Sequence, residues 1–166
     1  MSIRFCKIAL VAASFFFLFL VVFNNLTDYG SNYMFVEAVL SMSTTFEGNA
    51  GMWRAIHSPV IYHIFYAGII LWEAASMVLI GWGAFAMWKA KATDAKAFNQ
   101  SKKLAIIGLT SSMLQWYIAF LTVGAEWFLM WQSQSFNGQG AAHRMFVVMG
   151  VSLVFVALKD EELEDA

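Results

Sequence analysis

Two acidic residues, Glu73 and Glu126, lie within long apolar stretches of the sequence. A carboxylate near the centre of a membrane helix costs about 2.5–3.5 kcal/mol on insertion scales, so each group must be protonated, paired or hydrated. Lipid chains supply neither a partner for the charge nor water. Glu73 and Glu126 are therefore the first candidates for an intramembrane polar site.

Helical spacing groups other polar residues with the two carboxylates. Residues separated by multiples near 3.6 share a helix face, which places Tyr66 on the stripe of Glu73 and Gln115 on the stripe of Glu126. Two polar stripes on apolar helices are expected to face each other, so we predict a hydrogen bond between Tyr66 and Glu126. Together with two basic residues at compatible heights, the candidate site is Glu73, Glu126, Tyr66, Gln115, His63 and Arg144.

The polar stripes allow two interpretations. Polar residues between membrane helices often only hold the helices together, each contributing about 0.6 kcal/mol on average, and a single buried glutamate can stay protonated. Alternatively, the stripes form an outward-facing pocket that binds a ligand, a proton or a lipid head group. In either case His63 or Arg144 could neutralise Glu126.

Histidine and cysteine spacing indicates no metal or cofactor site. His57 and His63 do not share a helix face, so a bis-histidine haem has little support. Cys6 is the only cysteine, which excludes an internal disulfide and paired-cysteine metal motifs. We predict no catalytic residues, no metal and no cofactor.

The elements that must position these residues are membrane helices, because 60% of the residues are hydrophobic and only 13% are charged. The net charge of −1 gives no support for a nucleic-acid partner. Roughly 20 apolar residues cross the bilayer core, and four stretches qualify, at about 8–23, 59–88, 104–131 and 141–158. No small-residue cleavage site follows the first, which is expected to stay as an anchor rather than act as a signal peptide. We predict an all-α membrane protein with four transmembrane helices in one domain, 1–166.

Lysine and arginine positions predict the orientation, because short cytoplasmic loops retain positive charge. Basic residues precede the first stretch, fill the loop 89–103 and follow the fourth stretch, whereas only Arg54 and Arg144 fall on the other side. Both termini are therefore expected in the cytoplasm. On this topology Glu73 and Glu126 both lie in the outer half of their helices.

An outer segment, 24–58, separates the first two stretches. Within it, Tyr33–Met42 has helical spacing and is predicted to rest on the bilayer surface or on the bundle. The interfacial candidates of this segment are Tyr33, Phe35, Glu37, Trp53 and Arg54. The acidic tail 159–166 is expected to be solvated, and the small-residue tract GWGAFAMW, 81–88, predicts close helix packing.

Three tracts resemble a known family. They are FNNLTDYGSNYMFVEAVLSMSTTF at Phe23–Phe46, WRAI at Trp53–Ile56 and IILWE at Ile69–Glu73. The chain resembles the predicted small integral membrane proteins of domain-of-unknown-function family 2165 over nearly its whole length. The resemblance implies a bacterial inner-membrane protein with several helices and, because that family has no assigned activity, transfers no catalytic residues.

Two functional classes follow. The first is an accessory, assembly or structural subunit of a larger inner-membrane complex, whose partners are the lipid bilayer and another membrane protein or a second copy of the chain. The second is a transporter-like or enzymatic site in which Glu73 and Glu126 bind a proton, a cation or a small ligand.

Overall fold

The computed structural model describes residues 2–162 and is helical throughout its regular elements. Four helical stretches are long and apolar enough to cross a membrane: Ser2–Thr27, Pro59–Ala90, Ala95–Trp127 and Gln139–Ala157. The predicted all-helical class with four membrane helices is thereby confirmed. The elements are α1 (Ser2–Thr27), α2 (Tyr29–Leu40), η1 (Met52–Arg54), α3 (Pro59–Ala90), α4 (Ala95–Ser101), α5 (Lys103–Gln115), η2 (Trp116–Trp127), η3 (Met130–Gln132) and α6 (Gln139–Ala157).

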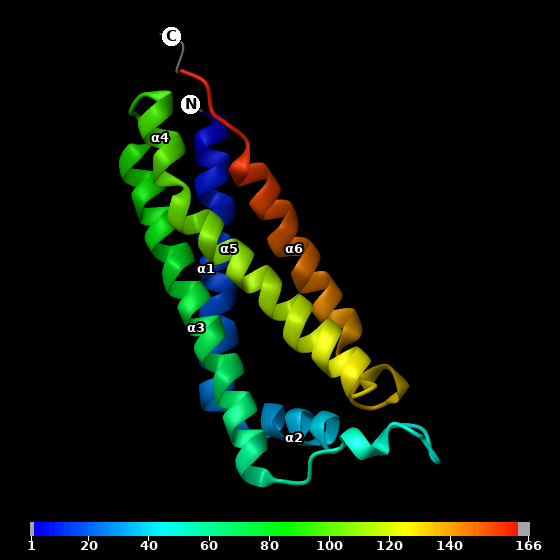
Figure 1. Cartoon of the computed structure of the whole chain (residues 1–166). Helices are drawn as coiled ribbons and strands as arrows, with labels where there is room; N and C mark the ends of the chain where they lie inside the picture. The colour runs from blue at the N-terminus through cyan, green and yellow to red at the C-terminus, as the bar shows by residue number, and fades with distance from the viewer. Residues whose placement is uncertain (1, 163–166) are drawn as a thin grey trace.

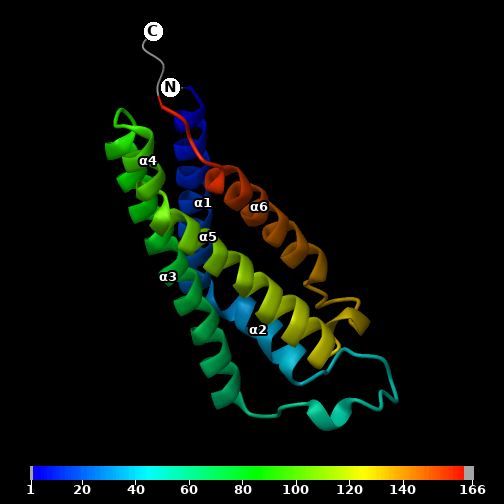
Figure 2. The same ribbon diagram turned by 45° about the horizontal axis from the view of Figure 1, so that its top comes forward.

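The bundle has two distinct ends (Figures 1 and 2). The start of α1, the α3–α4 turn and the end of α6 lie together at one end, which we call the terminal end. The opposite end, called the loop end, carries α2 and the irregular segment 41–58, and α2 lies crosswise there rather than along the bundle. The helix α2 overlaps the predicted helix Tyr33–Met42 but begins four residues earlier. Its location at a membrane surface stays a prediction.

The helices α3 and α5 approach most closely through two glycines. A Cβ atom on Gly83 would lie 2.3 Å from the backbone nitrogen of Ala105, and one on Gly108 would lie 2.6 Å from Ile80 Cγ1. Gly81 similarly leaves space for Phe15 of α1. The close helix packing predicted for the tract 81–88 is thereby confirmed. From this contact the two spans diverge toward the loop end, where α2 lies between them (Figure 1).

The third span is not a uniform α-helix. Its second half, η2, is a π-helix over Trp116–Trp127, in which the Phe128 backbone N–H donates to the Val123 carbonyl at 3.0 Å. A π-helix has i→i+5 bonds and is therefore wider than an α-helix. The span ends at Trp127, and Leu129, two residues later, has a left-handed φ of 54°. This change of helix type alters which side chains face the bundle.

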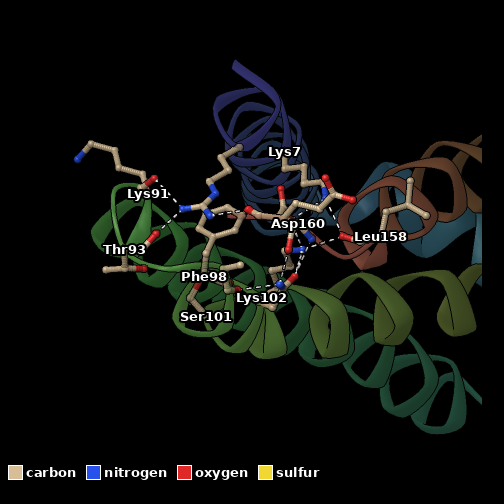
Figure 3. A network of polar contacts seen from close by, with 12 residues as sticks. Lys7, Lys91, Thr93, Phe98, Ser101, Lys102, Leu158 and Asp160 are labelled. Atoms are coloured by element: carbon tan, nitrogen blue, oxygen red, sulfur yellow. Dashed lines mark hydrogen bonds and ion pairs between the residues drawn. The ribbon is translucent and has the colours of Figure 1, made fainter. Parts of the chain in front are cut away.

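A buried ionic cluster closes the terminal end (Figure 3). The Lys7 ammonium lies 2.8 Å from Asp160 Oδ2, and Lys102 forms an ion pair with the same oxygen. Both lysines also donate to the Leu158 carbonyl, each at 2.7 Å. Arg4 is buried beside them, donates to the Thr93 carbonyl at 2.6 Å and stacks over the Phe98 ring.

The cluster corrects the expectation of a solvated acidic tail. Asp160 is buried, and its backbone N–H donates to Asn99 Oδ1 at 3.0 Å, so the start of the tail is fastened to α4. Burial alone would raise the pKa of Asp160, but hydrogen bonds and charges from Lys102 and Lys7 outweigh it and hold that pKa below its usual value. Residues 163–166 of the tail lie outside the described residues.

The substitution Gly83→Ala is expected to destabilise the bundle, because the new methyl group meets the backbone of α5. Overpacking of this kind costs about 1–3 kcal/mol. Gly68→Ala is the matched control, since a Cβ atom there meets nothing within 4 Å and alanine favours the helix. Denaturant titration in detergent micelles should lower the midpoint only for Gly83→Ala, and equal midpoints would contradict the packing argument.

The substitution Asp160→Asn should destabilise the protein by about 3 kcal/mol, because it leaves Lys7 and Lys102 buried without a carboxylate. Glu161→Gln, an exposed neighbour, is the control. In the wild type the folded pKa of Asp160 lies below the reference value of 3.8. The stabilisation from the cluster is therefore complete above that pH and is lost as the pH falls through the folded pKa.

The pH dependence supplies the second readout of the same experiment. Asp160→Asn has no carboxylate to protonate, so its stability should lack the acid-dependent loss that Glu161→Gln retains. If the Asn variant unfolds at the same denaturant concentration as the wild type at neutral pH, the cluster does not hold the tail.

Candidate functional site

Glu73 is buried at the junction of three helices. It belongs to α3 and is 2% exposed. Its Oε2 accepts a hydrogen bond of 2.6 Å from Nδ2 of Asn25, which lies in the last turns of α1. Gln115, at the end of α5, contacts α3 one turn before Glu73, where its side chain binds the backbone of Ile69. The α-helical periodicity of α3 places Tyr66 and Ser76 on the buried face that carries Glu73.

Asn25 is the hub of the hydrogen bonds around this carboxylate. Its Oδ1 accepts from Asn32 Nδ2 of α2 at 2.8 Å and from the Tyr66 hydroxyl at 3.3 Å. The Tyr66 hydroxyl also lies 3.2 Å from the Asn25 carbonyl oxygen. With its oxygen occupied by two donors, the amide of Asn25 is oriented so that its N–H faces Glu73.

A cavity of about 340 Å³ lies against this group, and we call it the Glu73 cavity. Residues from all four spans and from α2 line it, because it occupies the space between the diverging helices at the loop end. The lining residues are Val21, Asn24, Asn25, Asn32, Phe35, Val36, Tyr66, Ile69, Glu73, Trp116, Phe120, Gly138 and Ala141. Its polar groups are thus carboxyl, amide, phenol and indole.

Two polar atoms near the cavity lack partners in the described part of the chain. Trp116, which lines the Glu73 cavity, is 8% exposed, and its Nε1 makes no hydrogen bond. Gln115 donates through Nε2 to the Ile69 carbonyl at 3.2 Å, but its Oε1 is buried without a partner. An unpaired buried N–H or C=O costs about 1–3 kcal/mol, so each of these atoms is an unusual feature of the packing beside the cavity.

The Glu73 carboxylate has no cationic partner within residues 2–162, where both ion pairs belong to Asp160. A buried carboxylate without a counter-charge must be protonated, or must pair with a cation or hydrogen-bond donor from outside the chain. Over the same residues, no three His, Cys, Asp or Glu side chains gather in a way that could hold a metal ion. The chemistry available is therefore hydrogen bonding and proton exchange at one carboxyl group.

The structure separates Glu126 from this site. Glu126 is exposed at the end of η2, and the predicted hydrogen bond between Tyr66 and Glu126 is wrong, because Tyr66 binds Asn25. An α-helix turns by about 100° per residue, whereas a π-helix turns by roughly 80°. Between Gln115 and Glu126 this difference accumulates to about half a turn, so the two side chains leave the helix on opposite sides.

The two basic candidates also lie away from Glu126. His63 is exposed on α3, where its Nδ1 lies 2.8 Å from the Tyr29 hydroxyl and its ring stacks on Tyr33 at 4.4 Å. Arg144 is exposed in α6 and forms no ion pair within the described residues. Of the six residues predicted for the site, the structure brings Glu73, Tyr66 and Gln115 together and leaves Glu126, His63 and Arg144 outside.

The outer-segment candidates occupy two places. Phe35 of α2 lines the Glu73 cavity, whereas Glu37 on the same helix is exposed. Trp53 is 73% exposed, and Arg54 packs between the rings of Trp53 and Trp127 at 5.3 and 5.2 Å. Arg54 also donates to the Trp127 carbonyl at 3.1 Å, which fastens the segment to the end of η2.

Sequence reasoning missed Asn25, Asn32 and Trp116. Asn25 follows the apolar stretch 8–23 and reads as the start of a loop, although α1 continues to Thr27. The signal that could have identified it is the amide pair Asn24–Asn25 at the height of Glu73. Trp116 carries no such signal, because an indole in an apolar helix is ordinary.

No curated protein and no solved structure matches the chain. The family described as predicted small integral membrane protein, DUF2165, matches residues 3–159, from the first turn of α1 to the residue before Asp160. That range contains the four spans, α2 and every residue of the Glu73 cavity. The chain therefore belongs to this family of predicted small integral membrane proteins, as its sequence tracts suggest.

Proposed function

We propose that this protein is a membrane-embedded binding protein whose site is the Glu73 cavity. The single observation that carries the proposal is a carboxyl group, 2% exposed and without a cationic partner in the described chain, on the wall of a cavity of about 340 Å³. A carboxylate serving only as interhelical glue needs no adjoining cavity. An anchor for the polar group of a ligand does.

The geometry favours a ligand over a two-carboxylate cation path. Glu126 is exposed on the far side of η2, so Glu73 has no second acidic group across the cavity. The cavity offers a small polar group many hydrogen-bonding partners: one carboxyl group, three asparagines, a tyrosine and an indole. It offers a bare cation few negatively charged oxygens. Glu73 is assigned as the anchor, oriented by Asn25.

We further propose that the loop end faces away from the cytoplasm and that the protein resides in a bacterial inner membrane. The support is the distribution of basic residues, since those of the first turn, the α3–α5 connection and the tail all belong to the terminal end. The Glu73 cavity would then open in the outer half of the membrane, within reach of molecules in the outer leaflet.

The substitution Glu73→Gln should abolish binding of a molecule that co-purifies with the wild type. Native mass spectrometry of protein released from a mild detergent should show the bound mass on the wild type and on the matched control Glu126→Gln, and at least about tenfold less on Glu73→Gln. Circular dichroism and size-exclusion profiles establish that all three proteins are folded. Equal loading of Glu73→Gln and Glu126→Gln would sink the proposal.

The orientation can be tested with single cysteines in a Cys6→Ser background. Glu47 and Lys96 are both exposed, at the loop end and the terminal end respectively. A membrane-impermeant maleimide should label Glu47→Cys in intact spheroplasts and Lys96→Cys only after lysis. Labelling of Lys96→Cys from outside would reverse the topology.

An accessory role in a larger inner-membrane complex is the second candidate function, and one observation favours it. Trp53, Arg54 and Trp127 form an exposed aromatic and cationic cluster at the loop end, and these residue types are enriched at protein interfaces. Stoichiometric recovery of a membrane partner with the wild type, reduced by Trp53→Ala, would support this role. A partner that remains at full stoichiometry with Trp53→Ala would exclude the cluster as its docking surface.

A further inference from the structure

A second cavity adjoins the Glu73 cavity, and we call it the apolar groove. It has a volume of about 390 Å³ and runs between α2, α3 and η2. Four residues, Phe35, Val36, Ile69 and Phe120, line both cavities, so the two spaces meet at a common wall. The other residues that line the apolar groove are Val39, Leu40, Phe65, Gly68, Trp72, Ile118, Ala119, Val123, Gly124, Phe128 and Met130.

The apolar groove opens on the outer surface of the spans. Phe65 and Ile118, on its two sides, are 42% and 41% exposed, although both belong to helices of the membrane-spanning class. Gly68 lies three residues after Phe65 on α3 and also lines the groove, and a Cβ atom there would meet nothing within 4 Å. The one indole N–H of the groove, on Trp72, is already bonded to Ser111 at 3.0 Å. An apolar chain can therefore enter from the bilayer and finds no unpaired polar group.

The polar end differs in one respect that points to a ligand. Trp116 lines the Glu73 cavity, and its Nε1–H, which is buried within the protein, has no partner in the described chain. Glu73 lines the same cavity with a carboxyl group that Asn25 holds in place. A hydroxyl group has the chemistry that complements both, because it accepts from an indole N–H and donates to a carboxylate. To reach the buried Nε1–H, it needs a small displacement of the indole ring.

The charge of the lining decides between head groups. Among residues 2–162, no lysine, arginine or histidine lines either cavity, and Glu73 is the one acidic residue that does. A phosphate or carboxylate head would meet Glu73 without compensation, which is costly in a low-dielectric site. An uncharged head with hydroxyl groups introduces no net charge.

We propose that the two cavities together bind one uncharged lipid amphiphile, with its hydroxyl-bearing head between Trp116 and Glu73 and its chain in the apolar groove. This inference rests on the proposed function and adds the chemical class of the ligand. Acylglycerols and isoprenoid quinols share this chemistry. Both carry hydroxyl groups on an apolar chain and no charge.

The test uses the full-length protein in lipid nanodiscs with a monoacylglycerol that carries a diazirine in its chain. After irradiation, peptide mapping should place the label on 65–72 and 118–124, the two sides of the apolar groove. An anionic phosphatidylglycerol probe with the same diazirine chain should label these segments no more strongly, relative to their exposed area, than exposed apolar positions elsewhere, such as Trp82, Val151 and Val154. Excess unlabelled monoacylglycerol or short-chain isoprenoid quinol should remove the groove label, and the stronger competitor identifies the source.

Matched variants locate the two ends of the ligand. Gly68→Leu fills the apolar groove without a backbone clash, whereas Gly140→Leu adds the same side chain at an equally open position outside both cavities. Trp116→Phe removes the indole donor and keeps an aromatic ring at this position. Gly68→Leu and Trp116→Phe should each reduce specific labelling about tenfold, and Gly140→Leu should leave it unchanged.

The outcomes separate the inference from the function on which it rests. Uniform labelling of all lipid-facing surfaces, absence of competition, or equal labelling by the anionic probe overturns the amphiphile. If Gly68→Leu has no effect while Glu73→Gln still removes a co-purifying molecule, the binding function stands and the ligand lacks a chain in the groove. If neither substitution has an effect, both proposals fail. Should Gly68→Leu not fold, Trp116→Phe and the label map on the wild type still decide.

Discussion

The close contact between α3 and α5 is the constraint on which the other features depend. Gly83 and Gly108 let two helix backbones approach to a distance that a single methyl group would prevent. In a membrane this contact is held by packing rather than by exclusion of water, since lipid chains are as apolar as the helices. Helices that touch at one level and cross at an angle must separate elsewhere. Here the separation falls at the loop end, where α2 and two cavities occupy the space between them.

A second constraint comes from the buried carboxyl group of Glu73, which lines the cavity in this opening. Glu73 receives a neutral amide from Asn25 instead of an arginine or lysine. A buried salt bridge would have compensated the charge within the chain and closed the site to other partners. A neutral donor holds the carboxyl group in position without neutralising it. The carboxyl group can therefore still pair with a molecule that enters the cavity. Because Asn25 is itself held by Asn32 and Tyr66, the arrangement joins α1, α2 and α3.

Much of the architecture follows from the sequence, because apolar length and helical period act locally. They predict the four spans, the helix in the outer segment, the glycine contact, and the shared face of Tyr66 and Glu73. The prediction fails at Glu126, where the period itself changes in η2 and carries the side chain to the opposite side. It also misses Asp160, whose burial depends on Lys7, a residue at the other end of the chain. Hydropathy gives no information on such a long-range pair.

Two basic residues of α1, Arg4 and Lys7, have different surroundings before and after the bundle folds. Before α1 packs against its neighbours, Arg4 and Lys7 are hydrated charges at one end of an apolar helix, and charges in this position bias the orientation of a helix in the membrane. In the finished bundle the same side chains are almost fully enclosed and satisfied by Asp160 and by backbone carbonyls. The two charges are thus hydrated before the helices pack and are removed from water afterwards. Because Asp160 follows α6 in the chain, Lys7 can form this ion pair only after the fourth span has been made.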